Sequence, residues 1–176
     1  MTLSIAELEA RIRDVPDFPK PGIIFKDLTP LLGDGASLRA LRTHLAERVA
    51  AHRPDVVVGI EARGFIFASL VAPELGVGMV PVRKPGKLPW RTRRVEYALE
   101  YGTDALEMHQ DGLIAGQRVV IIDDLLATGG TAAATAKLCG MHGAVVVAHA
   151  FAVELAFLAG RDRLAPAAVD AVITFS

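Results

Sequence analysis

The chain has 176 residues, a formal net charge of −1 and 52% hydrophobic residues, so we expect residues 1–176 to form one domain with a sizeable core. This balance leaves no basic surplus for nucleic acid and no long apolar run for a membrane, so we expect neither partner. The single cysteine excludes an internal disulfide and is typical of a reducing compartment, which predicts a cytoplasmic protein.

The elements predicted along the chain alternate between helices and buried strands. Ser4 and Glu7 are spaced as a capping box, which predicts a short first helix rather than a signal peptide. Apolar residues spaced three and four apart predict a helix over 38–49. Unbroken apolar runs predict strands at residues 56–60, 79–82, 119–122, 145–148 and 171–175, with helices at 65–75 and from 132. This order predicts an α/β fold whose central, mostly parallel sheet is flanked by helices and binds ligands beyond the carboxyl ends of its strands.

Residues 84–102 interrupt this alternation with a basic segment rich in proline and glycine. Its cations are Lys84, Lys87, Arg91, Arg93 and Arg94. A solvated surface loop is one interpretation. We favour a mobile lid that brings cations to a polyphosphate, because long loops in compact domains are usually functional and this one leaves a strand on the ligand side.

The most informative segment is residues 119–131. Asp123 and Asp124 follow a buried run where we expect the strand to end, and a Thr-Gly-Gly-Thr loop then opens a helix. Glycines let backbone N–H groups approach an anion, and a helix N-terminus favours negative charge, so the loop predicts a phosphate site. Carboxylates beside a phosphate must bind hydroxyls or a cation. A phosphorylated sugar with Mg²⁺ supplies all of these groups.

This segment resembles the 5-phosphoribosyl-1-pyrophosphate (PRPP) binding motif of the type I phosphoribosyltransferases. From about residue 12 to 153 the chain is similar to the adenine phosphoribosyltransferases among them, with anchors at residues 18–27, 61–65, 82–89 and 99–102. The resemblance implies the type I phosphoribosyltransferase fold, with an N-terminal hood over about residues 1–35 and a lid over about 84–102. It also implies a homodimer that converts adenine and PRPP to AMP and pyrophosphate, with Mg²⁺ as cofactor.

The resemblance assigns the PRPP site as follows. Asp123 and Asp124 face the ribose and bind Mg²⁺ indirectly, and fixed carboxylates there would stabilise positive charge that develops on the sugar. The 5-phosphate lies in the loop formed by Ala127, Thr128, Gly129, Gly130 and Thr131. Pyrophosphate lies at Glu61, Ala62, Arg63, Arg83, Lys84 and Lys87, and the peptide between the first two of these residues is expected to be cis.

The resemblance also assigns the base site. Phe25 stacks on the purine while Ile24 and Lys26 offer backbone groups to its edge, although an ordinary core aromatic is the alternative for Phe25. Glu100 is the general base, with Tyr101 beside it. No role is carried onto Trp90, Arg91, Arg93 or Arg94, where the chain follows no pattern known to us in the family.

Two other functions remain open from the residues. A phosphoribosyltransferase for another purine base, such as xanthine or guanine, would share the PRPP motif. A PRPP-sensing regulator without turnover would share it too, but such proteins need a nucleic-acid surface, for which this chain offers neither a basic surplus nor spare length.

Overall fold

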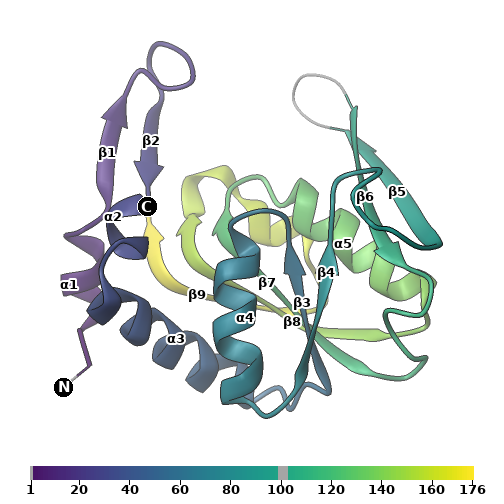
Figure 1. Ribbon diagram of the computed structural model, residues 1–176. Coiled ribbons are helices and arrows are strands. Elements are labelled where there is room, and N and C mark those ends of the chain that lie inside the picture. Colours follow the sequence, from purple (N-terminus) through teal and green to yellow (C-terminus); the bar gives the residue numbers. More distant parts are fainter. Residues whose placement is uncertain (1, 99–102) are drawn as a thin grey trace.

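A computed structural model describes residues 2–98 and 103–176 of the chain and contains a central sheet of five parallel strands. The strands lie in the order β4, β3, β7, β8, β9 (Figure 1). Their bounds are β3 Val56–Ile60, β4 Gly78–Val82, β7 Arg118–Leu126, β8 Val145–Leu155 and β9 Ala168–Phe175. The predicted fold class is confirmed, and each of the five predicted strands is present.

Helices cover both faces of the sheet. The helices α3 (Gly35–Ala50) and α4 (Gly64–Glu74) pack on one face, where Val57, Val120 and Ile122 are buried. On the opposite face α5 (Gly130–Met141) packs against the alternate residues of the same strands. Burial on both faces explains why these strands read as unbroken apolar runs. None of the helices in the described residues combines the length and apolar character needed to cross a membrane.

The prediction that β7 ends before the two aspartates is wrong. The strand continues to Leu126 because β8 is also longer than predicted and pairs with its far half, placing Asp123 opposite Phe151 and Leu125 opposite Val153. Asp123 and Asp124 are therefore strand residues. Successive strand side chains point to opposite faces, so the two carboxylates leave β7 in different directions.

The basic segment is also more ordered than predicted. Within it, Thr92–Ala98 forms strand β5, which pairs antiparallel with β6 (Thr103–His109). Arg93 and Arg94 obscured this strand because both are exposed, although they lie on its opposite faces. Val95 is buried against the sheet cluster, whereas Arg94 and Glu96 are exposed and form an ion pair of 2.9 Å.

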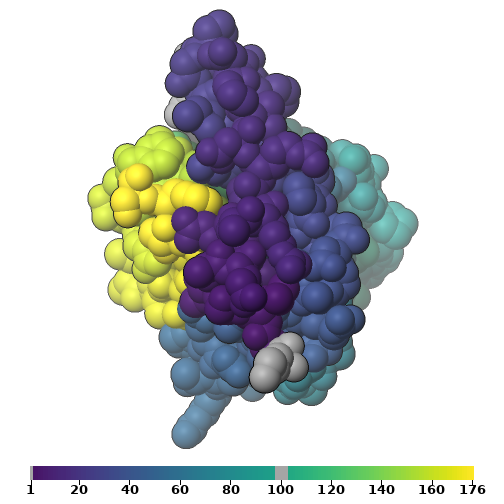
Figure 2. Space-filling view, turned by 90° about the vertical axis from the view of Figure 1, so that its left-hand side faces the viewer, coloured from purple at the N-terminus to yellow at the C-terminus, as the bar shows by residue number. Residues whose placement is uncertain are grey.

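A second hairpin lies near the N-terminus, where β1 (Arg13–Pro16) pairs antiparallel with β2 (Ile24–Asp27). The two hairpins rise on opposite sides of the sheet's upper edge (Figure 1), and the N-terminal hairpin projects beyond the rest of the molecule (Figure 2). The predicted capping box is confirmed in α1 (Ile5–Glu9), where the Glu7 N–H donates to Ser4 Oγ at 3.3 Å. The remaining elements are α2 (Thr29–Leu32) and the 3₁₀ turns η1 (Ala156–Leu158) and η2 (Gly160–Arg163).

Candidate functional site

The residues implied for PRPP lie at the edge where the parallel strands end, as expected for an open α/β sheet. Glu61 follows β3, Arg83 follows β4 and the Thr128–Thr131 loop follows β7. The parallel pairing of these three strands brings their carboxyl ends to one edge. Residues far apart in the sequence therefore share one site.

The predicted phosphate loop forms a hollow of about 90 Å³ at the N-terminus of α5. Gly129 is the N-cap, has φ +79° and provides no capping side chain, so the first N–H groups of the helix lack an intrahelical partner. Of the ten described residues that line the hollow, Asp123 is the only charged one. An anion would therefore be bound here by backbone N–H groups and the helix dipole rather than by cations.

The turn that contains Gly160 braces this loop from behind. A Cβ on Gly160 would lie 2.2 Å from the Ala127 carbonyl oxygen, and one on Gly129 would lie 2.5 Å from the Gly160 carbonyl oxygen. Arg161 fixes the turn by donating to both carboxylate oxygens of the buried Glu154, each at 2.6 Å. The loop and the brace are thus in backbone contact, which leaves no room for a side chain.

The two aspartates have different environments. Asp124 is buried and accepts a hydrogen bond from Arg63 Nε, whereas Asp123 Oδ1 accepts one from the Asp124 N–H at 2.9 Å. Burial, followed by the neighbouring Asp124 charge, raises the pKa of Asp123 well above its usual range. Burial alone would lower the pKa of Arg63, but the hydrogen bond to Asp124 and the charges of both aspartates outweigh it and raise that pKa.

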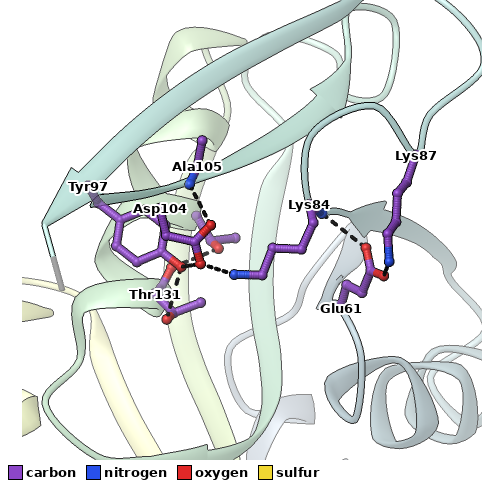
Figure 3. Close-up of polar contacts among 8 residues, drawn as sticks. Glu61, Lys84, Lys87, Tyr97, Asp104, Ala105 and Thr131 are labelled. Carbon is purple, nitrogen blue, oxygen red and sulfur yellow. Dashed lines mark hydrogen bonds and ion pairs between the residues drawn. The ribbon is translucent and has the colours of Figure 1, made fainter. Parts of the chain in front are cut away.

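Glu61 gathers the donors at the opposite end of the site. Its carboxylate accepts from Lys87 Nζ at 2.8 Å, from the Lys84 N–H at 3.0 Å and from Arg83 Nε at 3.2 Å (Figure 3 shows the two lysine contacts). Burial would raise the pKa of Glu61, but the hydrogen bonds from Lys87, Lys84 and Arg83 lower it from 4.5 to about 2. The Glu61–Ala62 peptide is cis, as the resemblance implies.

The side chain of Lys84 points away from Glu61. Its ammonium pairs with Asp104 on β6, and the same Asp104 oxygen accepts from the Tyr97 hydroxyl at 3.2 Å (Figure 3). The four cations implied for pyrophosphate therefore do not form one cluster. Arg63 is held by Asp124, Arg83 and Lys87 by Glu61, and Lys84 by Asp104.

The residues implied for the base lie on the N-terminal hairpin. Phe25 is half-buried, is absent from the described core clusters and packs edge-on against Phe18 at a ring separation of 5.2 Å. Ile24 is 58% exposed. The Lys26 ammonium is occupied by Asp14 at 2.6 Å and by the face of the Phe175 ring at 4.2 Å. Glu100 and Tyr101 lie outside the described residues.

Sequence reasoning missed three parts of this arrangement: the Gly160 brace, the Glu154–Arg161 pair that fixes it, and the contact between Lys84 and Asp104. A glycine-arginine pair shortly after a long apolar strand is a faint signal for the brace. No spacing rule links Lys84 to Asp104, since the backbone pairing of Arg83 with Glu107 of β6 brings them together. Among the described residues, no group of three or more His, Cys, Asp or Glu side chains is arranged to hold a metal by itself.

Comparisons with known proteins agree with this arrangement. The sequence model of the phosphoribosyl transferase domain family matches residues 31–171 of the chain. The chain is 58% identical over 165 residues to the adenine phosphoribosyltransferase of Roseiflexus sp. (strain RS-1), an alignment that covers 94% of each chain. The chain belongs to the adenine phosphoribosyltransferase family.

Solved structures of this family share the fold described above. The adenine phosphoribosyltransferase of Thermoanaerobacter pseudethanolicus superposes with a TM-score of 0.94 at 49% identity, covering 98% of this chain and all of the other. The Saccharomyces cerevisiae enzyme, crystallised with adenine and an imino-altritol bisphosphate, superposes with a TM-score of 0.88 at 39% identity, covering 96% of this chain and 97% of the other.

Proposed function

We propose that the protein transfers the 5-phosphoribosyl group of PRPP to adenine and releases AMP and pyrophosphate, a purine salvage reaction. The observation that carries the proposal is the Asp123–Asp124 pair beside a glycine loop at a helix N-terminus. A phosphate, sugar hydroxyls and a developing positive charge are the groups that this arrangement suits. The family to which the chain belongs supports the choice of reaction.

In this reaction a ring nitrogen of adenine bonds to the anomeric carbon as the bond from that carbon to pyrophosphate breaks. Positive charge builds on the sugar before the new bond is complete, as at other oxocarbenium-like centres. The backbone N–H groups of residues 127–131 hold the 5-phosphate. Asp123 and Asp124 bind the ribose hydroxyls and stabilise the charge, and Glu100 receives the proton that adenine loses, a role that rests on the resemblance.

Leaving pyrophosphate is strongly anionic, and Arg63, Arg83, Lys84 and Lys87 are the residues we assign to it. Their present carboxylate partners support this assignment, because a carboxylate and a phosphate oxygen attract the same donors. We propose that Asp123 and Asp124 would hold Mg²⁺ indirectly when PRPP is bound, and that the ion would supply positive charge to offset the charge on the leaving group. The described residues contain no group of three or more His, Cys, Asp or Glu side chains placed to hold a metal, which suits a metal that is bound mainly by the substrate.

Adenine would bind along the N-terminal hairpin. Within the part of the chain that the structure describes, β2 is paired only with β1, so half of its backbone groups remain open to a ligand. We assign a backbone carbonyl of the Ile24–Lys26 segment to the adenine amino group and a backbone N–H to its ring nitrogen, with Phe25 stacked on the ring. The Lys26 side chain, already bound to Asp14 and Phe175, is not the reader.

A panel of bases tests the function. With PRPP and Mg²⁺, we expect turnover of adenine and rejection of hypoxanthine by roughly 10⁴ or more in kcat/KM, because both contacts to hypoxanthine would be mismatched. Lys26→Ala should keep this ratio. Comparable values for the two bases would favour a transferase for another purine, and PRPP binding without turnover of any base would favour a PRPP-sensing regulator.

We also propose that the protein is a homodimer and that it has a mobile lid. A homodimer in the cytoplasm is supported by the family resemblance and the single cysteine, and the mass in solution, measured by light scattering, would test the dimer. Residues 84–96, with their basic side chains, would close over bound PRPP and exclude water. Their amide hydrogen exchange should slow when PRPP and Mg²⁺ bind, whereas unchanged exchange would indicate an ordinary surface segment.

A further inference from the structure

The side chain of Lys84 is separated from the other cations that follow β4. Arg83 and Lys87 both turn their side chains to Glu61, and the Lys84 backbone N–H does the same. The Lys84 ammonium instead reaches across to Asp104, the second residue of β6 (Figure 3). Backbone and side chain of one residue are thus held by two different carboxylates.

Asp104 is built to receive this ammonium. One of its oxygens accepts from the Ala105 N–H at 2.8 Å, and the other accepts from both Lys84 and the Tyr97 hydroxyl. Its side chain is 26% exposed, so solvent screens the pair only in part. The hydrogen bond from Lys84 is the main cause of the lowered pKa of Asp104, so the carboxylate is charged at neutral pH.

The same group of residues touches the phosphate loop. The Tyr97 hydroxyl lies 3.5 Å from Oγ1 of Thr131, the loop residue in the first turn of α5. The Lys84 ammonium therefore lies on the side of the site nearest the 5-phosphate loop rather than at the Glu61 end. It must leave Asp104, or share it, to engage pyrophosphate fully.

We propose that Asp104 is a positioning residue that holds the Lys84 ammonium back from pyrophosphate and so weakens the binding of this product. The inference rests on the proposed function. An ammonium that is paired in the free protein binds a new anion only after exchanging partners. The observed affinity is then the intrinsic affinity multiplied by the fraction of time for which the ammonium is unpaired. Fast release of a highly charged product is the benefit, because product release limits turnover in many enzymes.

The test is the pyrophosphate affinity of Asp104→Asn. Asparagine keeps the shape and the acceptor for the Ala105 N–H but removes the charge that holds Lys84. We expect pyrophosphate with Mg²⁺ to bind roughly tenfold more tightly by calorimetry, and its inhibition constant against PRPP to fall in step. Asp111→Asn is the matched control, since it removes the same charge from an exposed position just beyond β6 and should change neither value.

A second background shows whether the effect passes through Lys84. In Lys84→Met, adding Asp104→Asn should leave pyrophosphate affinity unchanged, because the ammonium is already gone. Unchanged or weaker binding in Asp104→Asn alone would overturn the proposal, as would tighter binding that persists without Lys84. If Asp104→Asn does not fold, Asp104→Thr, which suits a strand, tests the same point. Calorimetry measures pyrophosphate binding without turnover, so it tests this inference independently of catalysis. A wild-type protein that binds pyrophosphate but makes no AMP would contradict the proposed function, whereas the inference would still be decided by the affinities of the variants.

Discussion

The two ends of the proposed PRPP site are built in opposite ways. At the end that we assign to the 5-phosphate, the described residues that line the hollow include no lysine or arginine, and the Gly160 turn braces the loop through backbone contacts. The four cations that we assign to pyrophosphate do not form one cluster, and each is already paired with a carboxylate. A braced loop has little to rearrange when its ligand arrives, whereas paired cations must exchange partners. The difference suggests that one end anchors the substrate throughout while the other holds a group that has to leave.

The largest expected effect comes from the aspartates, which lie between these two designs: Asp123 lines the phosphate hollow and Asp124 holds Arg63. Asp123→Asn or Asp124→Asn should each lower kcat on the order of 10²–10³, since each removes a charge directed at a developing cation. Steady-state turnover with adenine, PRPP and Mg²⁺ measures this effect.

Thermal unfolding of the same variants separates chemistry from folding. The raised pKa of Asp123 means that its charged form is unfavourable in the folded protein, so Asp123→Asn should not lower stability at neutral pH. Wild-type turnover in either variant would show that this aspartate has no role in the reaction. It would then not link the two ends of the site.

A smaller effect is expected when the brace is broken. In Gly160→Ala the new Cβ would meet the Ala127 carbonyl oxygen at 2.2 Å, which forces the phosphate loop to move. Overpacking of this kind costs about 1–3 kcal/mol, so we expect the KM for PRPP to rise roughly tenfold. Initial rates at varied PRPP concentration provide the measurement.

Gly140→Ala is the matched control for this variant. Gly140 is an exposed residue of α5 where an added Cβ would meet nothing within 4 Å, and alanine is favoured in helices. Its KM should be unchanged and its stability equal or higher. An unchanged KM in Gly160→Ala would show that the phosphate loop is not held by its neighbour, and the contrast between the two ends would fail.

The smallest effect concerns Glu61 and acid. A carboxyl whose folded pKa is depressed stabilises the folded protein above its unfolded pKa, and this contribution is lost as the pH falls through the folded value. For Glu61 the window runs from 4.5 down to about 2. Over this window the difference in free energy of unfolding between wild type and Glu61→Gln should shrink by about 1–2 kcal/mol, after allowing for solvent screening. Urea denaturation at several pH values measures this difference in free energy of unfolding. A difference that stays constant with pH would mean that Glu61 does not pair with its neighbouring cations as described.

The sequence predicted those parts of the site that depend on short continuous stretches of residues. The strand at 56–60 is buried on both faces and reads as such, and the loop at 128–131 carries its glycines in order. The strand β5 was missed because Arg93 and Arg94 are both exposed although they lie on opposite faces of the strand, and they hide the alternation that Val95 and Tyr97 carry. The partners of Glu61 and Lys84 could not be predicted, because an ion pair between distant residues depends on the fold and has no periodicity.

The contact between Gly129 and Gly160 also bears on the order in which the protein is made. Strand β7 and the start of α5 leave the ribosome well before β8 and the turn that braces them, and chains begin to fold from the N-terminal end during synthesis. A nascent chain that ends before residue 160 therefore holds the glycine loop without its support. The braced form of the glycine loop is in this sense a late acquisition of the growing polypeptide, gained only after residue 160 has emerged.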